Sequence, residues 1–208
     1  DVDDFWFPKK LELQIPLFND PEVGIVYGNL YRFFVKKNKK EIYRKILPKG
    51  NITDKLLNDY VIGSPTYVIR GKLFKELKYY FNKNLHIIGD FDLNLRISTK
   101  WKIDCIQTPI AVARVHGKNV SLLNQDKEIS ELKTWYEDMK ENKLFSNNKN
   151  LKKIYLKALY LEILKAVSDG RYIESFSKLG KYPFSLNKIK LIFSLLIPKF
   201  IFKKIKNY

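Results

Sequence analysis

The sequence is poor in metal-binding and disulfide-forming residues. Cys105 is the one cysteine among 208 residues, which excludes an intramolecular disulfide and a cysteine-based zinc site. The two histidines, His86 and His116, limit any metal site to carboxylates with at most two imidazoles. Acidic residues are also scarce, because 22 Asp and Glu stand against 39 Lys and Arg, and the formal net charge is +17.

Long apolar runs are missing as well. A membrane-spanning helix needs about 20 predominantly apolar residues, whereas the longest run here, residues 191–197, is interrupted by Ser194. The chain does not begin with Met, and its start has no basic and apolar signal segment. We therefore expect a piece of a longer protein that works in a reducing, cytosolic setting.

The excess of positive charge allows three kinds of partner: nucleic acid, an anionic membrane surface, or phosphorylated substrates. A bias of the whole sequence toward Lys, Asn and Ile is a fourth explanation. Modules that bind nucleic acid usually carry a recognisable motif beside the charge. Helix-turn-helix, zinc-finger, RRM and KH signatures are all missing from this sequence, so we expect no nucleic-acid partner.

The chain changes in character near residue 123. A hydrophobic fraction of 45% excludes wholesale disorder. Residues 1–122 combine short apolar runs with Gly, Pro and Asn, which predicts an α/β domain with a mixed sheet. Residues 123–208 are predicted to form a helical appendage. The predicted strands are 23–27, 30–35, 64–70, 102–106 and 111–115, with a return strand within 41–47. The predicted helices are 8–14, 54–57, 72–80, 91–99, 127–141, 151–167 and 172–179.

The last 28 residues are both basic and apolar. Residues 181–208 contain seven lysines and no acidic residue, among many Phe, Leu and Ile. Such a segment fits a helix that lies in the interface of an anionic membrane. A helix that packs on its own protein and leaves its lysines in water explains the pattern equally well.

An acidic cluster opens the chain, where Asp1, Asp3 and Asp4 precede Phe-Trp-Phe-Pro. On an extended segment Asp1 and Asp3 point the same way, and a hard divalent cation such as Mg²⁺ or Mn²⁺ relieves their repulsion. An Asp-rich turn in water is the plain alternative.

Two further polar clusters follow. Asp90, in the run Gly-Asp-Phe-Asp-Leu, is suited to an N-cap or to a general base at the rim of a cleft. In the third cluster, Arg114 and His116 alternate on a predicted strand and so face one side. Arg suits phosphate, and His suits a metal or a phosphate oxygen. A lone His is more often structural.

Together, the three clusters resemble the family-2 glycosyltransferases with the GT-A fold. The run Asp-x-Asp-Asp-x-Trp-x-Pro-x-Lys-Leu-Glu resembles the segment around the DxD motif of that family. Gly89 through Arg96 looks like its acidic motif, and Arg114-x-His116-Gly-x-Asn-x-Ser121 looks like its last motif. Order and spacing match over about residues 1–122. The implied fold class is α/β, with residues 1–122 as the C-terminal half of a GT-A catalytic domain.

The resemblance implies an inverting, metal-dependent transfer from a nucleotide-sugar donor to a saccharide or lipid-linked acceptor, in the synthesis of a cell-surface polysaccharide. Asp90 is the implied catalytic base. Asp3, Asp1 and His116 are the implied residues at Mg²⁺ or Mn²⁺, with Asp1, Arg114 and His116 at the donor diphosphate. The residues expected on the acceptor side are Trp6, Arg70 and Asp92.

The chain departs from the family in two places. Gly89 stands where many members have Glu before the catalytic Asp. The family has a nucleotide-binding half before the DxD motif, roughly 100 residues if built from ~30-residue βαβ units, and we expect it to be missing from these 208 residues. We therefore expect these 208 residues to be inactive or poorly folded alone. We expect a cytoplasmic, peripheral protein at the inner face of the plasma membrane, held there through residues 181–208. The alternative function is a non-catalytic basic fragment that binds membrane or nucleic acid.

Overall fold

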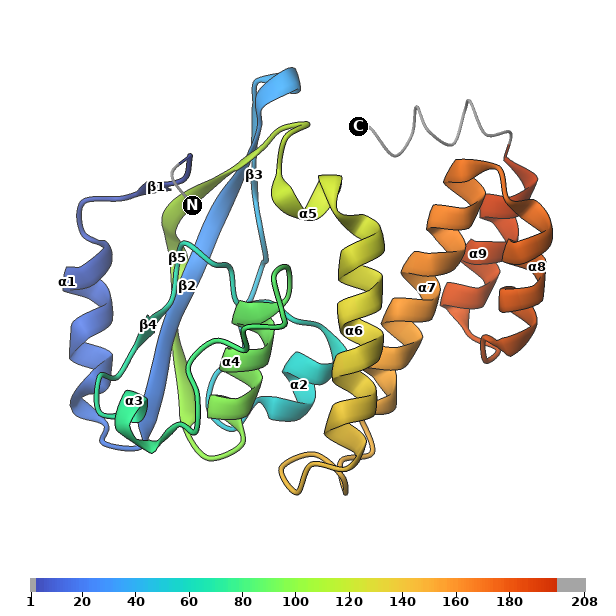
Figure 1. Cartoon of the computed structure of the whole chain (residues 1–208). Coiled ribbons are helices and arrows are strands. Elements are labelled where there is room, and N and C mark those ends of the chain that lie inside the picture. Colours follow the sequence, from blue (N-terminus) through green and yellow to red (C-terminus); the bar gives the residue numbers. More distant parts are fainter. Residues whose placement is uncertain (1–2, 198–208) are drawn as a thin grey trace. The chain divides into compact units, whose positions relative to one another are not determined.

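A computed structural model describes residues 3–197 of the chain (Figure 1). The chain divides into two compact units, Asp1–Leu123 and Asn124–Tyr208. In the described residues the first unit combines a mixed five-stranded sheet with helices, and the second unit is helical. The fold class is therefore α/β, as predicted.

The sheet of the first unit is built around two long parallel strands. Strand β2 pairs in parallel with β5, while β1 adds to β5, and β3 and β4 add to β2, all three antiparallel. The order is β1-β5-β2-β3, with β4 also on β2. The strands are β1 (Phe5–Trp6), β2 (Val23–Phe34), β3 (Lys39–Ile42), β4 (Val68–Ile69) and β5 (Lys102–Val115).

Each long strand is continuous where the sequence predicts two separate strands. Gly28 and Asn29 lie at register shifts of β2 rather than in a turn. A β-carbon on Gly28 would lie 2.3 Å from Ile110 Cδ1, so the glycine allows close approach of β5. Asn29 is fully buried, and its amide donates to the carbonyls of Arg44 and Gln107. The polar and small residues that suggested a break therefore sit at an irregularity inside the sheet.

The helices of the first unit are short, except for α4. Helix α4 contributes Phe91, Leu93, Leu95 and Ile97 to the core, since each is less than 5% exposed. The predicted helix over 72–80 shrinks to the four residues of α3, and the predicted strand over 64–70 shrinks to β4. The elements are α1 (Lys10–Gln14), η1 (Ile15–Asn19), η2 (Val35–Lys37), α2 (Thr53–Asn58), α3 (Leu73–Glu76), α4 (Gly89–Ser98) and α5 (Val120–Leu123).

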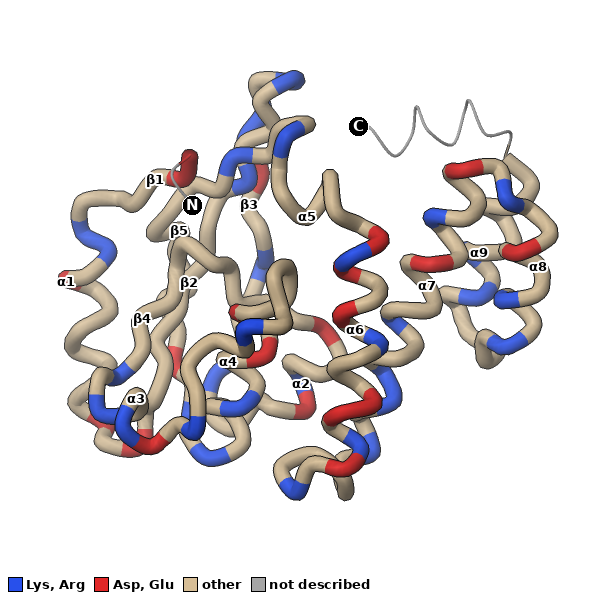
Figure 2. The backbone as a smooth tube through the Cα atoms, in the orientation of Figure 1, with Lys and Arg blue, Asp and Glu red and all other residues tan. Residues whose placement is uncertain are grey.

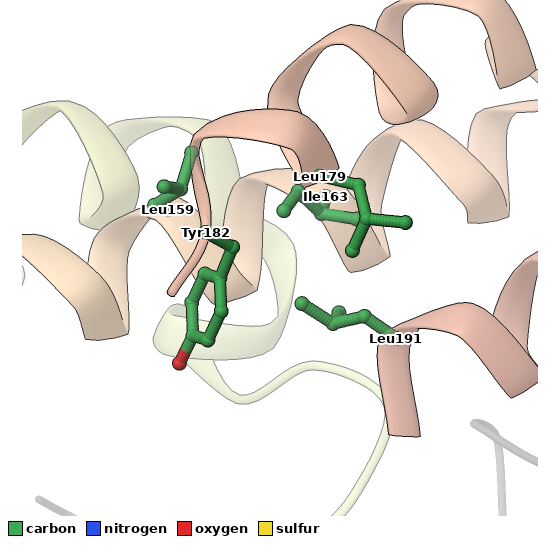
Figure 3. Packing of buried hydrophobic residues seen from close by; sticks show 5 residues of the cluster. All are labelled: Leu159, Ile163, Leu179, Tyr182 and Leu191. Carbon is green, nitrogen blue, oxygen red and sulfur yellow. The ribbon is translucent and has the colours of Figure 1, made fainter. Parts of the chain in front are cut away.

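The second unit consists of α6 (Gln125–Lys140), α7 (Lys152–Asp169), α8 (Tyr172–Lys181) and α9 (Leu186–Leu196) in its described part. Helix α7 ends where the sequence predicts, because Gly170 adopts the left-handed conformation (φ 82°) that favours glycine. Leu159 and Ile163 of α7 pack with Leu179, Tyr182 and Leu191 in one buried cluster (Figure 3). The predicted basic tail is thus helical over α9, and residues 198–208 lie outside the described part.

None of the helices in residues 3–197 combines the length and the apolar character needed to cross a membrane.

Candidate functional site

Asp3 and His116, 113 residues apart in sequence, are in direct contact. His116 Nε2 lies 2.6 Å from Asp3 Oδ2, and both side chains remain about 30% exposed. Strand β1 brings Asp3 to this place because Phe5 pairs with Val112, so the start of the chain runs beside the end of β5. Asp4 strengthens the junction, since its Oδ1 accepts a 3.0 Å hydrogen bond from the backbone N–H of Arg114.

The loop after β5 determines which nitrogen of His116 carries the proton. The backbone N–H of Lys118 donates to His116 Nδ1 at 3.1 Å, so Nδ1 is an acceptor. Nε2 therefore holds the hydrogen and donates it to Asp3. Asn119 fixes the loop, because its Oδ1 accepts from the His116 N–H and its Nδ2 donates to the Arg114 carbonyl. The Asn of the last motif thus has a positioning role that its place in the sequence did not reveal.

This hydrogen bond lowers the pKa of the Asp3 carboxyl below its ordinary value, with a smaller contribution from a backbone hydrogen bond. Asp3 is therefore an anion at neutral pH, with Oδ2 held by His116. A metal ion on Nε2 would replace the proton that Nε2 donates to Asp3. It would also disturb the hydrogen bond from the Lys118 N–H to Nδ1 on the other side of the ring. The observed arrangement makes His116 a residue that orients the carboxylate, a role common next to metal-binding carboxylates.

Asp90 lies in a second cluster, at the first turn of α4. Ser64 Oγ donates to Asp90 Oδ2 at 2.9 Å, and the N–H of Phe91 donates to Oδ1 at 2.8 Å. The carboxylate is half-buried and Ser64 is exposed, so solvent reaches this cluster. Figure 1 shows that α4 runs antiparallel to the β5 strand that follows it, so its first turn points toward the end of the sheet where β5 finishes.

Two tyrosines surround this carboxylate. Burial raises the pKa of Tyr67 to about 12, and the negative charge of Asp90 adds to the effect. Burial and, next, the charge of Asp90 also raise the pKa of Tyr60 well above its ordinary value, while Asn94 donates a 2.8 Å hydrogen bond to its hydroxyl. The charge of Asp90 contributes to the raised pKa of both phenols, so both tyrosines lie within its electrostatic range. Sequence reasoning missed Ser64, Tyr60 and Tyr67, because their approach depends on the tertiary fold.

Two of the residues expected on the acceptor side have structural partners instead. Asp92 is fully buried and binds Arg96 one helical turn later, with distances of 2.9 and 3.0 Å. Arg70 donates to the carbonyls of Phe18, Asp20 and Val23, each at 2.7 Å. As placed, Asp92 holds α4, and Arg70 holds the segment that leads from η1 into β2.

Trp6, the third such residue, is 60% exposed on β1. Beneath it, Lys10 is only 1% exposed, and its Nζ lies 4.3 Å from the centre of the indole ring. That amine has no hydrogen-bond partner among the described residues, and burial lowers its pKa. The attraction between cation and ring helps to hold Trp6 in place. Trp6 and Lys10 both belong to the Trp-x-Pro-x-Lys run, so their spacing in the sequence could have indicated this contact.

The end of β5 near Asp3 lies beside a basic hairpin. Phe33 of β2 pairs with Arg114, so the β2–β3 hairpin extends alongside the loop that carries His116. Figure 2 shows Lys and Arg at the hairpin tip and at the turn after β5. A positive surface of this kind attracts anions such as a diphosphate. Its members are Arg32, Lys36, Lys37, Lys39, Lys40, Arg114 and Lys118.

The donor set around Asp3 is small. Within residues 3–197, no group of three or more His, Cys, Asp or Glu side chains lies close enough to hold a metal ion. Asp1, the other expected ligand, lies outside the described residues. Mg²⁺ is commonly held by one or two carboxylates together with substrate phosphates, so Asp3 fits a cation that is completed by a bound diphosphate.

Comparison with known proteins adds no assignment: no protein-family model and no curated protein sequence matches this chain.

Proposed function

We propose that the chain is the C-terminal part of a metal-dependent, inverting glycosyltransferase of the GT-A fold. It would move a sugar from a nucleotide-sugar donor to a saccharide or lipid-linked acceptor. The contact of Asp3 with His116 carries the proposal. Two motifs from opposite ends of the first unit meet there, and their order and spacing are those of the family that the sequence resembles.

Each residue of the proposed site has a chemical role that its surroundings support. Asp3 would hold Mg²⁺ or Mn²⁺ through its carboxylate, while His116 keeps the carboxylate ionised and oriented. The bound cation supplies charge neutralisation for the departing nucleoside diphosphate. Arg114, the basic hairpin and Lys118 add positive charge on the same side.

Asp90 would take the proton from the acceptor hydroxyl as that oxygen attacks the anomeric carbon. A general base must reach the hydroxyl within hydrogen-bond distance. The carboxylate of Asp90 is accessible, and the hydrogen bond from Ser64 fixes its orientation. The exposed ring of Trp6 offers a stacking surface for a sugar or a base.

The proposal is tested first by binding. Isothermal titration calorimetry of a protein that joins this chain to a nucleotide-binding half, with UDP or GDP and with or without Mn²⁺, should show binding that depends on the metal. Asp3→Asn should weaken it by about tenfold or more, the equivalent of ~1.4 kcal/mol. The matched control is Asp138→Asn, which changes an exposed aspartate of the second unit. Equal binding by Asp3→Asn and the parent chain would remove Asp3 from the site.

Turnover is tested in a protein that joins this chain to a nucleotide-binding half. With UDP-, GDP- and dTDP-linked sugars, Asp90→Asn should lower kcat by on the order of 10²–10⁴, the usual contribution of a general base. Binding of the nucleoside diphosphate should persist. Unchanged turnover excludes Asp90 as the base, and failure of every donor in the presence of metal contradicts glycosyl transfer.

A further inference from the structure

Helix α9 is apolar on two opposite faces. One face is buried inside the protein, because Leu191 is fully buried and packs with Leu179 and Tyr182 against α7 (Figure 3). The other face is not, since Leu186, Phe193 and Leu196 are each more than 60% exposed. An apolar stripe on a helix normally faces other apolar groups instead of water. The outward face of α9 therefore lacks, within residues 3–197, the environment that its sequence requires.

Helix α8 also carries exposed apolar side chains. Ile173 and Phe176 are 90% and 63% exposed. At 100° per residue they lie on the opposite flank of α8 from Glu174 and Lys178, and Lys178 turns toward α7, where it binds Glu162 at 2.9 Å.

The exposed residues of α8 and α9 thus both point away from α7. Phe184, in the connection between these two helices, is 85% exposed. We call the whole set the outer apolar surface: Ile173, Phe176, Phe184, Leu186, Phe193 and Leu196.

The charges next to this surface select one kind of partner. Lys181 and Lys190 are exposed and close to it in sequence, whereas Lys188 donates a 2.7 Å hydrogen bond to the Tyr182 carbonyl. No acidic residue occurs from position 181 to position 208. A second copy of the chain would bring the same lysines together, which is unfavourable. An anionic bilayer offers both parts of the match, since apolar side chains enter the boundary of headgroups and acyl chains while lysines meet the lipid charge.

We propose that α8 and α9 bind an anionic phospholipid surface through the outer apolar surface, with their axes in the membrane plane. Unlike a free basic tail, this surface is built on a folded unit, because the inner face of the same helices forms the core around Leu191. The sequence left open a helix in a membrane interface and a helix that packs on its own protein. The proposal assigns the first role to the outer face of α9 and the second to its inner face. The inference does not depend on glycosyl transfer.

Vesicle flotation of the full chain provides the test, with phosphatidylglycerol/phosphatidylcholine vesicles compared with phosphatidylcholine alone. We expect binding to the anionic vesicles that weakens as salt is raised. Lys181→Glu with Lys190→Glu should reduce the partition coefficient by at least about tenfold, because each lysine near an anionic leaflet contributes about 1 kcal/mol. Lys83→Glu, in an exposed loop of the first unit, is the charge control and should bind like the parent.

The apolar part is tested with Phe176→Ser and Phe193→Ser together, against Ile46→Ser, which alters a residue of the first unit that is 81% exposed. The double variant should lose flotation while its circular dichroism and melting temperature stay close to those of the parent, because both rings are outside the core. Retained flotation of this variant overturns the proposal. So does equal binding to neutral and anionic vesicles. A parent chain that ignores vesicles but dimerises in light scattering, and becomes monomeric in the double variant, assigns the surface to self-association instead.

Discussion

Ser64 donates a hydrogen bond of 2.9 Å to Asp90 across 26 residues of sequence. The serine precedes Pro65 in the segment that leads to β4, and the aspartate opens α4. A second donor, the N–H of Phe91, binds the other oxygen of the same carboxylate. The candidate base is thus held by one hydrogen bond from its own helix and one from a distant segment, which restricts its direction without burying it.

Removal of the serine hydroxyl should therefore affect turnover more than binding. In a protein that joins this chain to a nucleotide-binding half, Ser64→Ala is expected to lower kcat by about tenfold, because a misaligned base loses part of its usual 10²–10⁴-fold contribution. KM for the donor should change little. Ser64→Thr, which keeps the hydroxyl at an exposed position, should restore most of kcat. Equal loss in both variants would indicate a packing defect instead of positioning.

The contact between Asp3 and His116 predicts a dependence on pH. Because the pKa of Asp3 is lowered in the folded chain, the folded state binds fewer protons there than the unfolded state does. The resulting stabilisation is complete above the pKa of an unfolded aspartate and disappears as pH falls through the lowered value. Melting temperatures of the parent and Asp3→Asn should therefore differ at pH 6.5, and the difference should shrink as pH falls through the lowered pKa of Asp3.

A direct check uses the carboxyl ¹³C resonance of Asp3. Its titration midpoint should move to higher pH in His116→Ala, since the hydrogen bond from the imidazole is the largest cause of the lowered pKa. An unchanged midpoint would mean that the two side chains do not interact in solution. Glu41, whose pKa is lowered mainly by Lys39, serves as an internal reference that this substitution should leave in place.

Much of the fold follows from local patterns, and the errors have a common cause. The apolar spacing of α7 and its glycine end predicted that helix correctly, because its inner face and its cap are both encoded locally. The break predicted between two strands near Gly28 and Asn29 was wrong, because glycine and asparagine occur in β-bulges as well as in turns. Only the approach of Ile110 and the carbonyl of Gln107 distinguishes the two.

The candidate site shows the same limit. Motif order predicted that Asp3 and His116 belong together, and the structure places them in contact. The role of His116 as a donor to Asp3 depends on the hydrogen bond from the Lys118 N–H. A backbone group of this kind cannot be predicted from side-chain patterns. Likewise, Asp92 was expected on the acceptor side, and it lies two residues after Asp90 in the acidic motif. On a helix that step of two residues turns the side chain by about 200° into the core.

Removal of one partner of the buried pair Asp92–Arg96 should be strongly destabilising. Arg96 also donates to the carbonyls of Tyr79 and Tyr80, so it anchors the loop before α4. Asp92→Ala leaves a guanidinium without its counter-charge and should lower the free energy of unfolding by about 3–5 kcal/mol. Urea unfolding followed by circular dichroism measures this loss. Asp59→Ala, which breaks the exposed pair with Arg44, should cost less than about 1 kcal/mol; similar losses in both variants would contradict the assignment.

The last prediction concerns the junction of the two long strands. Gly28→Ala would place a methyl group 2.3 Å from Ile110 Cδ1 and 2.6 Å from its Cγ1, and Ile110 is buried, so its side chain has little freedom to move. We expect a loss of about 1–3 kcal/mol in the free energy of unfolding, the usual range for overpacking. Ile110→Ala alone should cost about 2–5 kcal/mol by leaving a cavity. In the double variant the new methyl enters that cavity, so the combined loss should be smaller than the sum by about 1 kcal/mol or more. Strict additivity in urea unfolding would contradict the close approach of Gly28 and Ile110.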